Sequence, residues 1–272
     1  MVKQYILASD FDQTLSYNDS GALLAELIGA SGFDQKVEGL SKIHLVQQGA
    51  ELAYLILLDP DFRKVRRDDL IAAGKRVRLK QNVALFARLL DNLSEGYKFE
   101  FIVISAAPQE IVQSALEGIV PPERIFGTNF EFDPATGEVR RIIRASAGWG
   151  KVTVLEEQRA RLGVSPDCVI YVGDGSSDLP VMMHVNQGDG LTIAVSENEY
   201  ITRLAKRTVL SDNAMSVLVP VLEDVLRWDS TRIRGLFASQ GLTVRDWDKR
   251  RTDTLTIQEF GGPYEAAAEH RR

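Results

Sequence analysis

The chain has 272 residues, of which 44% are hydrophobic and 26% are charged, an ordinary composition for a globular protein. Acidic residues outnumber basic ones by 38 to 32, and the net charge of −6 disfavours general binding to nucleic acid or anionic membranes. No apolar run approaches the roughly 18 residues of a membrane span, and the N-terminus does not resemble a signal peptide. We therefore expect a cytoplasmic protein with one large domain, or a core that carries an inserted subdomain.

The first predicted element is a strand at residues 5–8, and about eighty residues without a convincing strand follow it. Within residues 16–98 apolar side chains recur at helical spacing in three segments, 20–32, 36–58 and 81–96. Ser20 is a candidate N-cap of the first segment, and Gly32 lies near its expected end. We predict a helical subdomain inserted between the first strand and the second.

Strands and helices alternate in the rest of the chain. Apolar runs at 99–105, 168–173 and 191–195 predict buried strands, 115–125 and 151–163 predict intervening helices, and 130–142 predicts a β-hairpin. This alternation is typical of an α/β fold, with a Rossmann-like parallel sheet covered by helices on both faces.

The predicted organisation has three parts. The core comprises residues 1–15 and 97–228, the inserted helical subdomain comprises 16–96, and residues 229–272 form a C-terminal helical extension with a loose tail. Cys168 is the only cysteine and lies in an apolar run, which predicts a buried core thiol. His44, His184 and His270 lack the spacing of metal ligands, so we expect no zinc site.

Polar side chains follow three of the predicted strands. Asp10 and Asp12 follow the first strand, Ser105 ends the second, and Asp174 and Asp178 follow the third. The carboxyl ends of parallel strands meet at one edge of a sheet, where ligands bind. Clustered carboxylates repel one another, so a cation is expected among them, and Mg²⁺ suits oxygen ligands beside a phosphate.

Lys151 adds a positive charge at the start of a predicted helix, where an anion is favoured. Its surroundings do not form a P-loop, because Ala145 and Val152 break the required pattern. The segment GDGSSD, residues 173–178, matches neither a dinucleotide-binding loop nor an EF-hand. A simple turn or a solvated lysine would explain either feature alone, whereas their shared place at the strand ends favours a phosphate site.

These residues resemble the four motifs of the haloacid dehalogenase superfamily of phosphohydrolases. Residues 10–14 are similar to motif I, Ser105 to motif II, Lys151 to motif III and residues 174–178 to motif IV. The helical insertion resembles the C1 cap of the phosphoserine phosphatase-like branch. Ala106 and Ala107 stand where many relatives have a glycine, and Ser177 replaces the asparagine common in phosphoserine phosphatases. These departures leave the substrate open.

The resemblance implies a role for each motif residue. Asp10 would attack phosphorus to form an aspartyl-phosphate, and Asp12 would act as the general acid and base. Mg²⁺ would be held by the Asp10 carboxylate, the Asp12 backbone carbonyl and Asp174. The phosphate oxygens would be bound by Ser105, Lys151 and the backbone amides of Phe11, Asp12 and Ala106. Asp178 would orient Lys151 or a metal-bound water.

The expected partner is a small phosphorylated metabolite, neither nucleic acid nor membrane, and the sequence leaves the oligomeric state open. Residues 61–80 contain eight Lys or Arg against three Asp, so Arg63, Arg66 and Arg67 are candidate substrate-binding residues unless they form a solvated helix face. Asp19 occupies the position of a glutamate that faces the substrate amine in phosphoserine phosphatases. It could recognise a cation such as that of phosphoethanolamine, or it could only cap the following helix.

The activity predicted on these grounds is that of a Mg²⁺-dependent phosphatase acting on a small phosphomonoester. A phosphotransferase or mutase on the same fold is one alternative. A non-catalytic protein that binds metal and phosphate is another, although it would have no need of the second acid, Asp12.

Overall fold

A seven-stranded sheet forms the centre of the first of the two units into which the chain divides, residues 1–227 and 228–272. The computed structural model describes residues 2–43, 47–93, 96–245 and 247. The strand order is β4-β3-β2-β1-β5-β6-β7. The strands are β1 Lys3–Ser9, β2 Tyr97–Pro108, β3 Ile125–Phe132, β4 Val139–Arg144, β5 Val169–Gly173, β6 Leu191–Ala194 and β7 Arg207–Thr208.

All neighbouring strands are parallel except β3 and β4. Strand β1 lies between β2 and β5, with Ser9 opposite Val103 on one side and Val172 on the other. Residues 5–9 of β1 are all buried. Helices on both faces explain why these strands are apolar at nearly every position. The predicted α/β fold with a Rossmann-like parallel sheet is confirmed.

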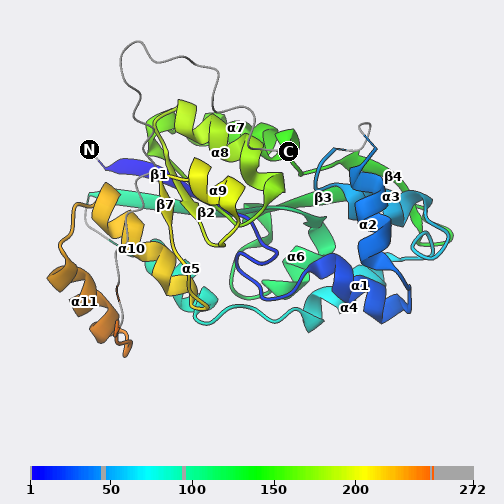
Figure 1. The fold of residues 1–272 in the computed structure, drawn as a ribbon, viewed down its shortest axis with the longest axis horizontal. Helices are drawn as coiled ribbons and strands as arrows, with labels where there is room; N and C mark the ends of the chain where they lie inside the picture. Colours follow the sequence, from blue (N-terminus) through cyan, green and yellow to red (C-terminus); the bar gives the residue numbers. More distant parts are fainter. Residues whose placement is uncertain (1, 44–46, 94–95, 246, 248–272) are drawn as a thin grey trace, which may run out of the picture. The chain divides into compact units, whose positions relative to one another are not determined.

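The helices of the first unit are α1 Ser20–Ile28, α2 Phe33–Ser41, α3 Glu51–Leu58, α4 Arg67–Arg76, α5 Val83–Leu90, α6 Gln109–Ala115, α7 Trp149–Leu162, α8 Leu179–Gln187, α9 Glu199–Leu204 and α10 Leu218–Pro220. Short 3₁₀ turns cover Pro122–Arg124, Pro166–Cys168, Ser176–Asp178 and Ala214–Val217, and a π turn covers Val221–Val225. Helices α7 and α8 lie on one face of the sheet, and α5 and α10 lie on the other (Figure 1).

Helices α1 to α4 share a hydrophobic cluster with the β3–β4 hairpin. Leu24 of α1, Ile56 of α3 and Leu70 of α4 are fully buried in this cluster. Phe130 of β3 is also a buried member, and Ile142 of β4 packs against it. Helix α5 instead packs on β2 of the central sheet. The inserted segment therefore buries its apolar side chains against a later part of the chain, and the boundaries proposed for the cap remain a prediction.

Several predicted elements are confirmed. The hairpin over 130–142 is formed by β3 and β4, which pair antiparallel. Helix α7 ends at Leu162, and Gly163 follows it in the left-handed conformation with φ 65°, as the sequence indicated. Cys168 is buried and free.

Three helix predictions were wrong in their extent. Residues 115–125 do not form a helix, because α6 ends at Ala115 and Gly118 follows at φ 75° before two prolines. The first helix of the insertion ends at Ile28, not near Gly32, because Gly29 takes the left-handed cap conformation. The segment 36–58 contains two separate helices, α2 and α3.

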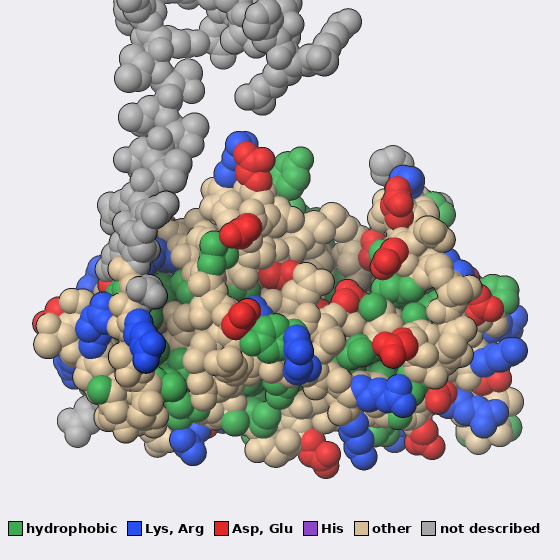
Figure 2. All heavy atoms as spheres, turned by 60° about the horizontal axis from the view of Figure 1, so that its bottom comes forward, with side chains coloured by type: hydrophobic (Ala, Val, Ile, Leu, Met, Phe, Trp, Pro, Cys, Tyr) green, Lys and Arg blue, Asp and Glu red, His purple; other side chains and the backbone are tan. Residues whose placement is uncertain are grey.

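The second unit contains α11, Ser230–Ser239, which is capped by the Asp229 side chain. The loose tail predicted at the C-terminus lies outside the described residues. Among the described helices, none has the length and apolarity needed to cross a bilayer. Figure 2 shows acidic and basic side chains interspersed over the face in view, in keeping with a modest net charge.

Candidate active site

Three aspartates come together where β1 and β5 end. The pairing of Ser9 with Val172 sets Asp10 beside the end of β5, and the Asp10 amide donates to the Val172 carbonyl at 2.9 Å. Asp10, Asp174 and Asp178 each offer a carboxylate oxygen, and these oxygens lie within 4.8 Å of one another. The sheet topology therefore produces the acidic cluster that the sequence predicted at this edge.

Lys151 lies fully buried among these acids. Its Nζ is 2.8 Å from Asp10 Oδ1 and 2.6 Å from Asp178 Oδ1. Burial alone would lower the pKa of Lys151, but the two carboxylates outweigh it and hold that pKa above its usual value. Burial and the charge of Asp178 raise the pKa of Asp10, whereas Lys151 opposes the rise. The lysine thus keeps its charge and faces the predicted nucleophile.

Asp178 receives hydrogen bonds at both carboxylate oxygens. Oδ1 accepts from Lys151 at 2.6 Å and from the Tyr171 hydroxyl at 2.7 Å, and Oδ2 accepts from the amides of Asp174 at 3.1 Å and Gly175 at 3.2 Å. Four donors occupy the lone pairs that a metal would need. Asp178 therefore suits an orienting role better than direct coordination.

Gly173 allows Asp178 to come this close to the end of β5. A Cβ atom added at residue 173 would lie 2.5 Å from the Asp178 carboxyl group. Any side chain at this position would therefore push Asp178 away from Lys151. Glycine is therefore required at residue 173, directly before Asp174, for steric reasons.

Asp12 lies in a tight turn that follows β1. The Phe11 carbonyl accepts hydrogen bonds from the amides of the residues three to five positions ahead, Thr14, Leu15 and Ser16. The Asp12 carboxylate accepts from the Ser20 amide at 3.0 Å and the Ser20 hydroxyl at 2.7 Å. Burial, with a smaller contribution from Asp19, raises the pKa of Asp12 to about 7. A carboxyl group with this pKa can exchange a proton near neutral pH.

Asp174 is fixed from two sides. Its Oδ1 accepts from the Thr14 hydroxyl at 2.9 Å, and its backbone carbonyl accepts from Ser196 at 2.6 Å. Burial and the nearby Asp178 raise its pKa to about 6. Lys80, whose own pKa is lowered by burial, contributes positive charge close to Asp174.

The donor set fits a hard divalent cation. Within the described part of the chain, the second carboxylate oxygens of Asp10 and Asp174 receive no hydrogen bond, so both remain available as ligands. Oxygen ligands of this kind suit Mg²⁺. Burial, and after it the charge of the neighbouring aspartates, raises the pKa values of Asp10 and Asp174, and a bound cation would favour their ionised forms.

Ser105 and Ala106 lie on β2, which pairs with β1, and Ser105 is two residues beyond Val103, the partner of Ser9. Ser105 is buried, and its hydroxyl accepts from the Ala107 amide at 3.1 Å. The Ala106 carbonyl accepts from the Thr128 hydroxyl at 2.7 Å, and Thr128 in turn accepts from the Ser146 amide at 3.2 Å. These bonds tie the end of β2 to the loop that leads into Lys151.

The inserted segment contacts two of the site loops. The Gln47 side chain donates to the Ala147 carbonyl. Gly49, at φ 88°, lies so close to Ser177 that an added Cβ would be 2.7 Å from the Ser177 Cβ. Gln47 and Gly49, just before α3, therefore lie against the loops that precede α7 and follow β5.

The four remaining candidate residues are exposed. Asp19 is the N-cap of α1, where its side chain accepts from the Ala22 amide at 2.9 Å, so the cap is Asp19 and not Ser20. Arg67 lies 3.9 Å from Glu110 of α6, and Arg66 lies against Gly137 of the hairpin turn. Among the described residues, no hydrogen bond or ion pair joins Arg63, Arg66 or Arg67 to the aspartates, and their role in substrate binding remains a prediction.

Sequence reasoning missed several residues that hold the site together. Tyr171 was identified only as part of an apolar strand, yet its hydroxyl binds Asp178. Ser20, Thr128 and Ser146 carry no motif that marks them. Only Tyr171 offered a signal that could have identified it, because its hydroxyl lies within an otherwise apolar strand.

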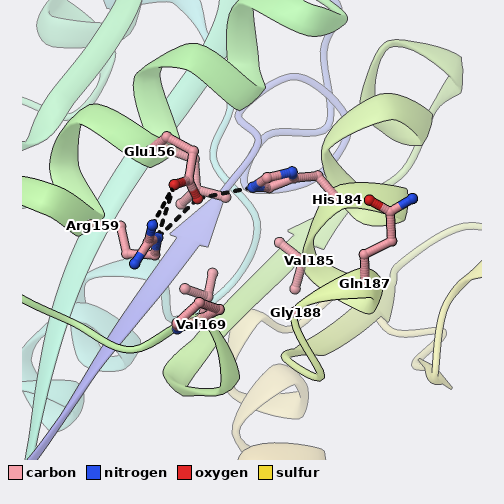
Figure 3. A pocket seen from close by; sticks show the side chains of 9 residues that line it. Glu156, Arg159, Val169, His184, Val185, Gln187 and Gly188 are labelled. Carbon is pink, nitrogen blue, oxygen red and sulfur yellow. Dashed lines mark hydrogen bonds and ion pairs between the residues drawn. The ribbon is translucent and has the colours of Figure 1, made fainter.

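A separate pocket lies at the other end of β5. Its volume is about 230 Å³, and Val169, the first residue of β5, lines it together with residues of α7 and α8. Glu156 bridges Arg159 and His184 along its rim (Figure 3). The carboxyl ends of parallel strands are where α/β folds bind ligands, so we assign the candidate site to the aspartates.

Known proteins show the same fold. A phosphoserine phosphatase in apo form has a TM-score of 0.62 at 17% identity, covering 83% of this chain and 99% of its own. A phospho-aspartyl intermediate analogue of phosphoserine phosphatase has a TM-score of 0.62 at 18% identity, and the match covers 79% of this chain and 98% of the other. A phosphoserine phosphohydrolase-like protein from Francisella tularensis subsp. tularensis SCHU S4 has a TM-score of 0.61 at 17% identity, and the match covers 80% of this chain and 98% of the other.

No curated protein matches the chain in sequence. The family model described as haloacid dehalogenase-like hydrolase matches residues 7–183, which include Asp10, Ser105, Lys151 and Asp178. The match extends over well over half of the chain and agrees with the fold and with the resemblance in the four motifs. The chain therefore belongs to the haloacid dehalogenase-like hydrolase family.

Proposed function

We propose that the protein is a Mg²⁺-dependent phosphatase that hydrolyses a small phosphomonoester through an aspartyl-phosphate intermediate. The observation that carries this proposal is the pairing of Asp10 with Lys151 at 2.8 Å, beside a second carboxyl group, Asp12, that is held separately by Ser20. A nucleophile, a buried cation and a proton carrier are the groups that phosphoryl transfer to a carboxylate requires.

The proposed reaction has two steps. An Asp10 carboxylate oxygen bonds to phosphorus while the bond from phosphorus to the bridging oxygen breaks, and Asp12 gives its proton to that leaving oxygen. Asp12, now a carboxylate, then takes a proton from water, whose oxygen attacks phosphorus. Phosphate leaves, and the Asp10 carboxylate is restored. Each proton released is accepted by a named group.

Two positive charges, that of Lys151 and that of Mg²⁺, would offset the negative charge of the phosphate. Lys151 would hold non-bridging oxygens, assisted by Ser105 and the amides of Phe11, Asp12 and Ala106. Mg²⁺ would be held by Asp10, the Asp12 carbonyl and Asp174, where its charge would offset that of the phosphate and polarise the P–O bonds. Asp178 would keep Lys151 directed at Asp10.

The substrate class is proposed from the size and charge of the surroundings. A small phosphorylated metabolite fits an acidic chain whose site is partly covered by the inserted segment. Phosphoserine and phosphoethanolamine are candidates, because phosphoserine phosphatases are among the proteins of similar fold and Asp19 follows Asp10 by nine residues. The capping bond of Asp19 supports its structural role equally well.

The first test is a hydrolysis screen of small phosphomonoesters with Mg²⁺, measured as phosphate release without an added acceptor. We expect activity that excess EDTA abolishes and Mg²⁺ restores. The variant Asp10→Asn should lose nearly all turnover, with an unchanged circular dichroism spectrum. Substantial activity in folded Asp10→Asn protein would reject Asp10 as the nucleophile, and phosphate release only with an added acceptor would favour a transferase.

A further inference from the structure

Both carboxyl oxygens of Asp12 accept hydrogen bonds from a single residue. Ser20 donates its backbone amide to Oδ1 at 3.0 Å and its hydroxyl to Oδ2 at 2.7 Å. Ser20 is only 1% exposed and is the first residue of α1. The two bonds close a ring with the carboxyl group, so they fix both its position and the rotation of its plane.

The local structure of α1 makes the Ser20 amide available for this contact. The first amides of a helix have no partner within the helix. Asp19, the N-cap, accepts from the Ala22 amide and so satisfies one of them. The Ser20 amide points to Asp12, and the serine hydroxyl adds the second bond. Alanine at this position would keep the amide and lose the hydroxyl.

We propose that Ser20 is a positioning residue that holds the Asp12 carboxyl group toward the leaving oxygen of the substrate. The inference rests on the proposed function, in which Asp12 is the proton carrier. Each carboxyl oxygen has a further lone pair, so Asp12 can carry its proton while Ser20 holds it. In the first step that proton passes to the bridging oxygen as its bond to phosphorus breaks.

A positioning role predicts a dependence on the leaving group. An alkoxide is a poor leaving group and needs a well-placed proton donor, whereas 4-nitrophenolate leaves without much assistance. The quantity to compare is kcat/KM, because it reports the steps up to release of the alcohol and leaves out hydrolysis of the intermediate. A residue that only stabilised the fold would affect both substrates alike.

The experiment compares Ser20→Ala with the unaltered protein on 4-nitrophenyl phosphate and on the best alkyl monoester from the screen. We expect kcat/KM to fall by about ten- to a hundredfold for the alkyl substrate and by less than about threefold for the aryl substrate. Ser20→Thr, which keeps a hydroxyl, should recover most of the alkyl activity. Ser20→Cys keeps the shape of the side chain but replaces the hydroxyl with a larger thiol that is a weak donor, and it should reproduce the selective loss.

Ser230→Ala is a matched control, because the exposed Ser230 is likewise the first residue of a helix, α11, and follows an aspartate N-cap, Asp229. It should leave the ratio of the two kcat/KM values unchanged. Equal losses on both substrates in folded Ser20→Ala and Ser20→Cys, or no loss on either, would overturn the inference. If the unaltered protein hydrolyses no phosphomonoester at all, the proposed function fails instead.

Discussion

Lys151 is a buried charge that the fold stabilises with ion pairs. An isolated buried ammonium group is costly, and Lys151 has no exposed surface. It is tolerated because two carboxylates lie within 2.8 Å, one of which, Asp178, is itself held by three further donors. The position of the lysine therefore depends on the donors that hold Asp178 as well as on the two carboxylates.

Tyr171 is the donor to Asp178 from inside the sheet, and its removal can be tested without changing the shape of the core. The variant Tyr171→Phe loses only the hydroxyl, leaving a buried carboxylate with one donor fewer. We expect the free energy of unfolding to fall by about 1–3 kcal/mol, measured by denaturant titration. Tyr200→Phe is the control, because Tyr200 is 77% exposed and its loss should change stability little. Equal stability of both variants would contradict the importance of this bond.

The residues at the strand ends were predictable, and their supporting residues were not. Asp10, Asp174 and Asp178 follow apolar runs, so the parallel sheet alone places them at one edge. The bonds of Ser20 and Thr128 depend on how separate loops meet, which no local pattern reports. The arginines of 61–80 were candidates by charge alone, and their role in substrate binding stays a prediction.

At the scale of elements, α4 of the insertion meets α6 of the core at a glycine. Gly74 is buried, and a Cβ added there would lie 2.3 Å from the Ile111 carbonyl oxygen. Close to it, the Ser114 hydroxyl donates to the Ile71 carbonyl at 2.8 Å. The two helices approach this closely only because residue 74 has no side chain.

Gly74→Ala should therefore destabilise the protein, although alanine is the better helix former. We expect a net loss of about 1–3 kcal/mol from overpacking, measured by denaturant titration. Gly39→Ala is the matched control in α2, because nothing lies within 4 Å of its added Cβ. It should stabilise the protein by up to about 1 kcal/mol. Equal gains in both variants would show that α4 and α6 can separate at no cost.

Element types were easier to predict than element ends. The apolar strands and α7 have strong patterns, and Gly163 marks the end of α7. The pattern of apolar residues continues beyond Ala115, so the sequence suggested a helix there, yet Gly118 and the two prolines after it end helical structure. Turn residues outweighed periodicity at this point.

At the scale of the whole molecule, the acidic cluster links stability to pH and metal. Burial raises the pKa values of Asp12 to about 7 and Asp174 to about 6, and it also raises that of Asp10. In the unfolded chain such carboxyl groups titrate at about pH 4. Between these values the folded protein binds more protons than the unfolded chain, so stability falls as pH rises.

We therefore expect the metal-free protein to have a lower thermal midpoint at pH 7.5 than at pH 5. Under the proposed function Mg²⁺ would bind the ionised cluster, so we expect it to raise the midpoint clearly at pH 7.5 and much less at pH 5. Asp174→Asn should flatten both dependences. A metal-free midpoint that stays constant between these pH values would contradict the assignment of the raised pKa values.

The hydrophobic cluster shared by the insertion and the β3–β4 hairpin has a consequence for biosynthesis. Leu24, Ile56 and Leu70 emerge from the ribosome well before Phe130 and Ile142, which complete their burial. Until the hairpin follows, the nascent helices expose an apolar face that has no permanent partner. We therefore expect the inserted segment not to fold on its own. A ribosome-bound chain that stops before residue 125 should be more sensitive to protease in this segment than one that includes the hairpin.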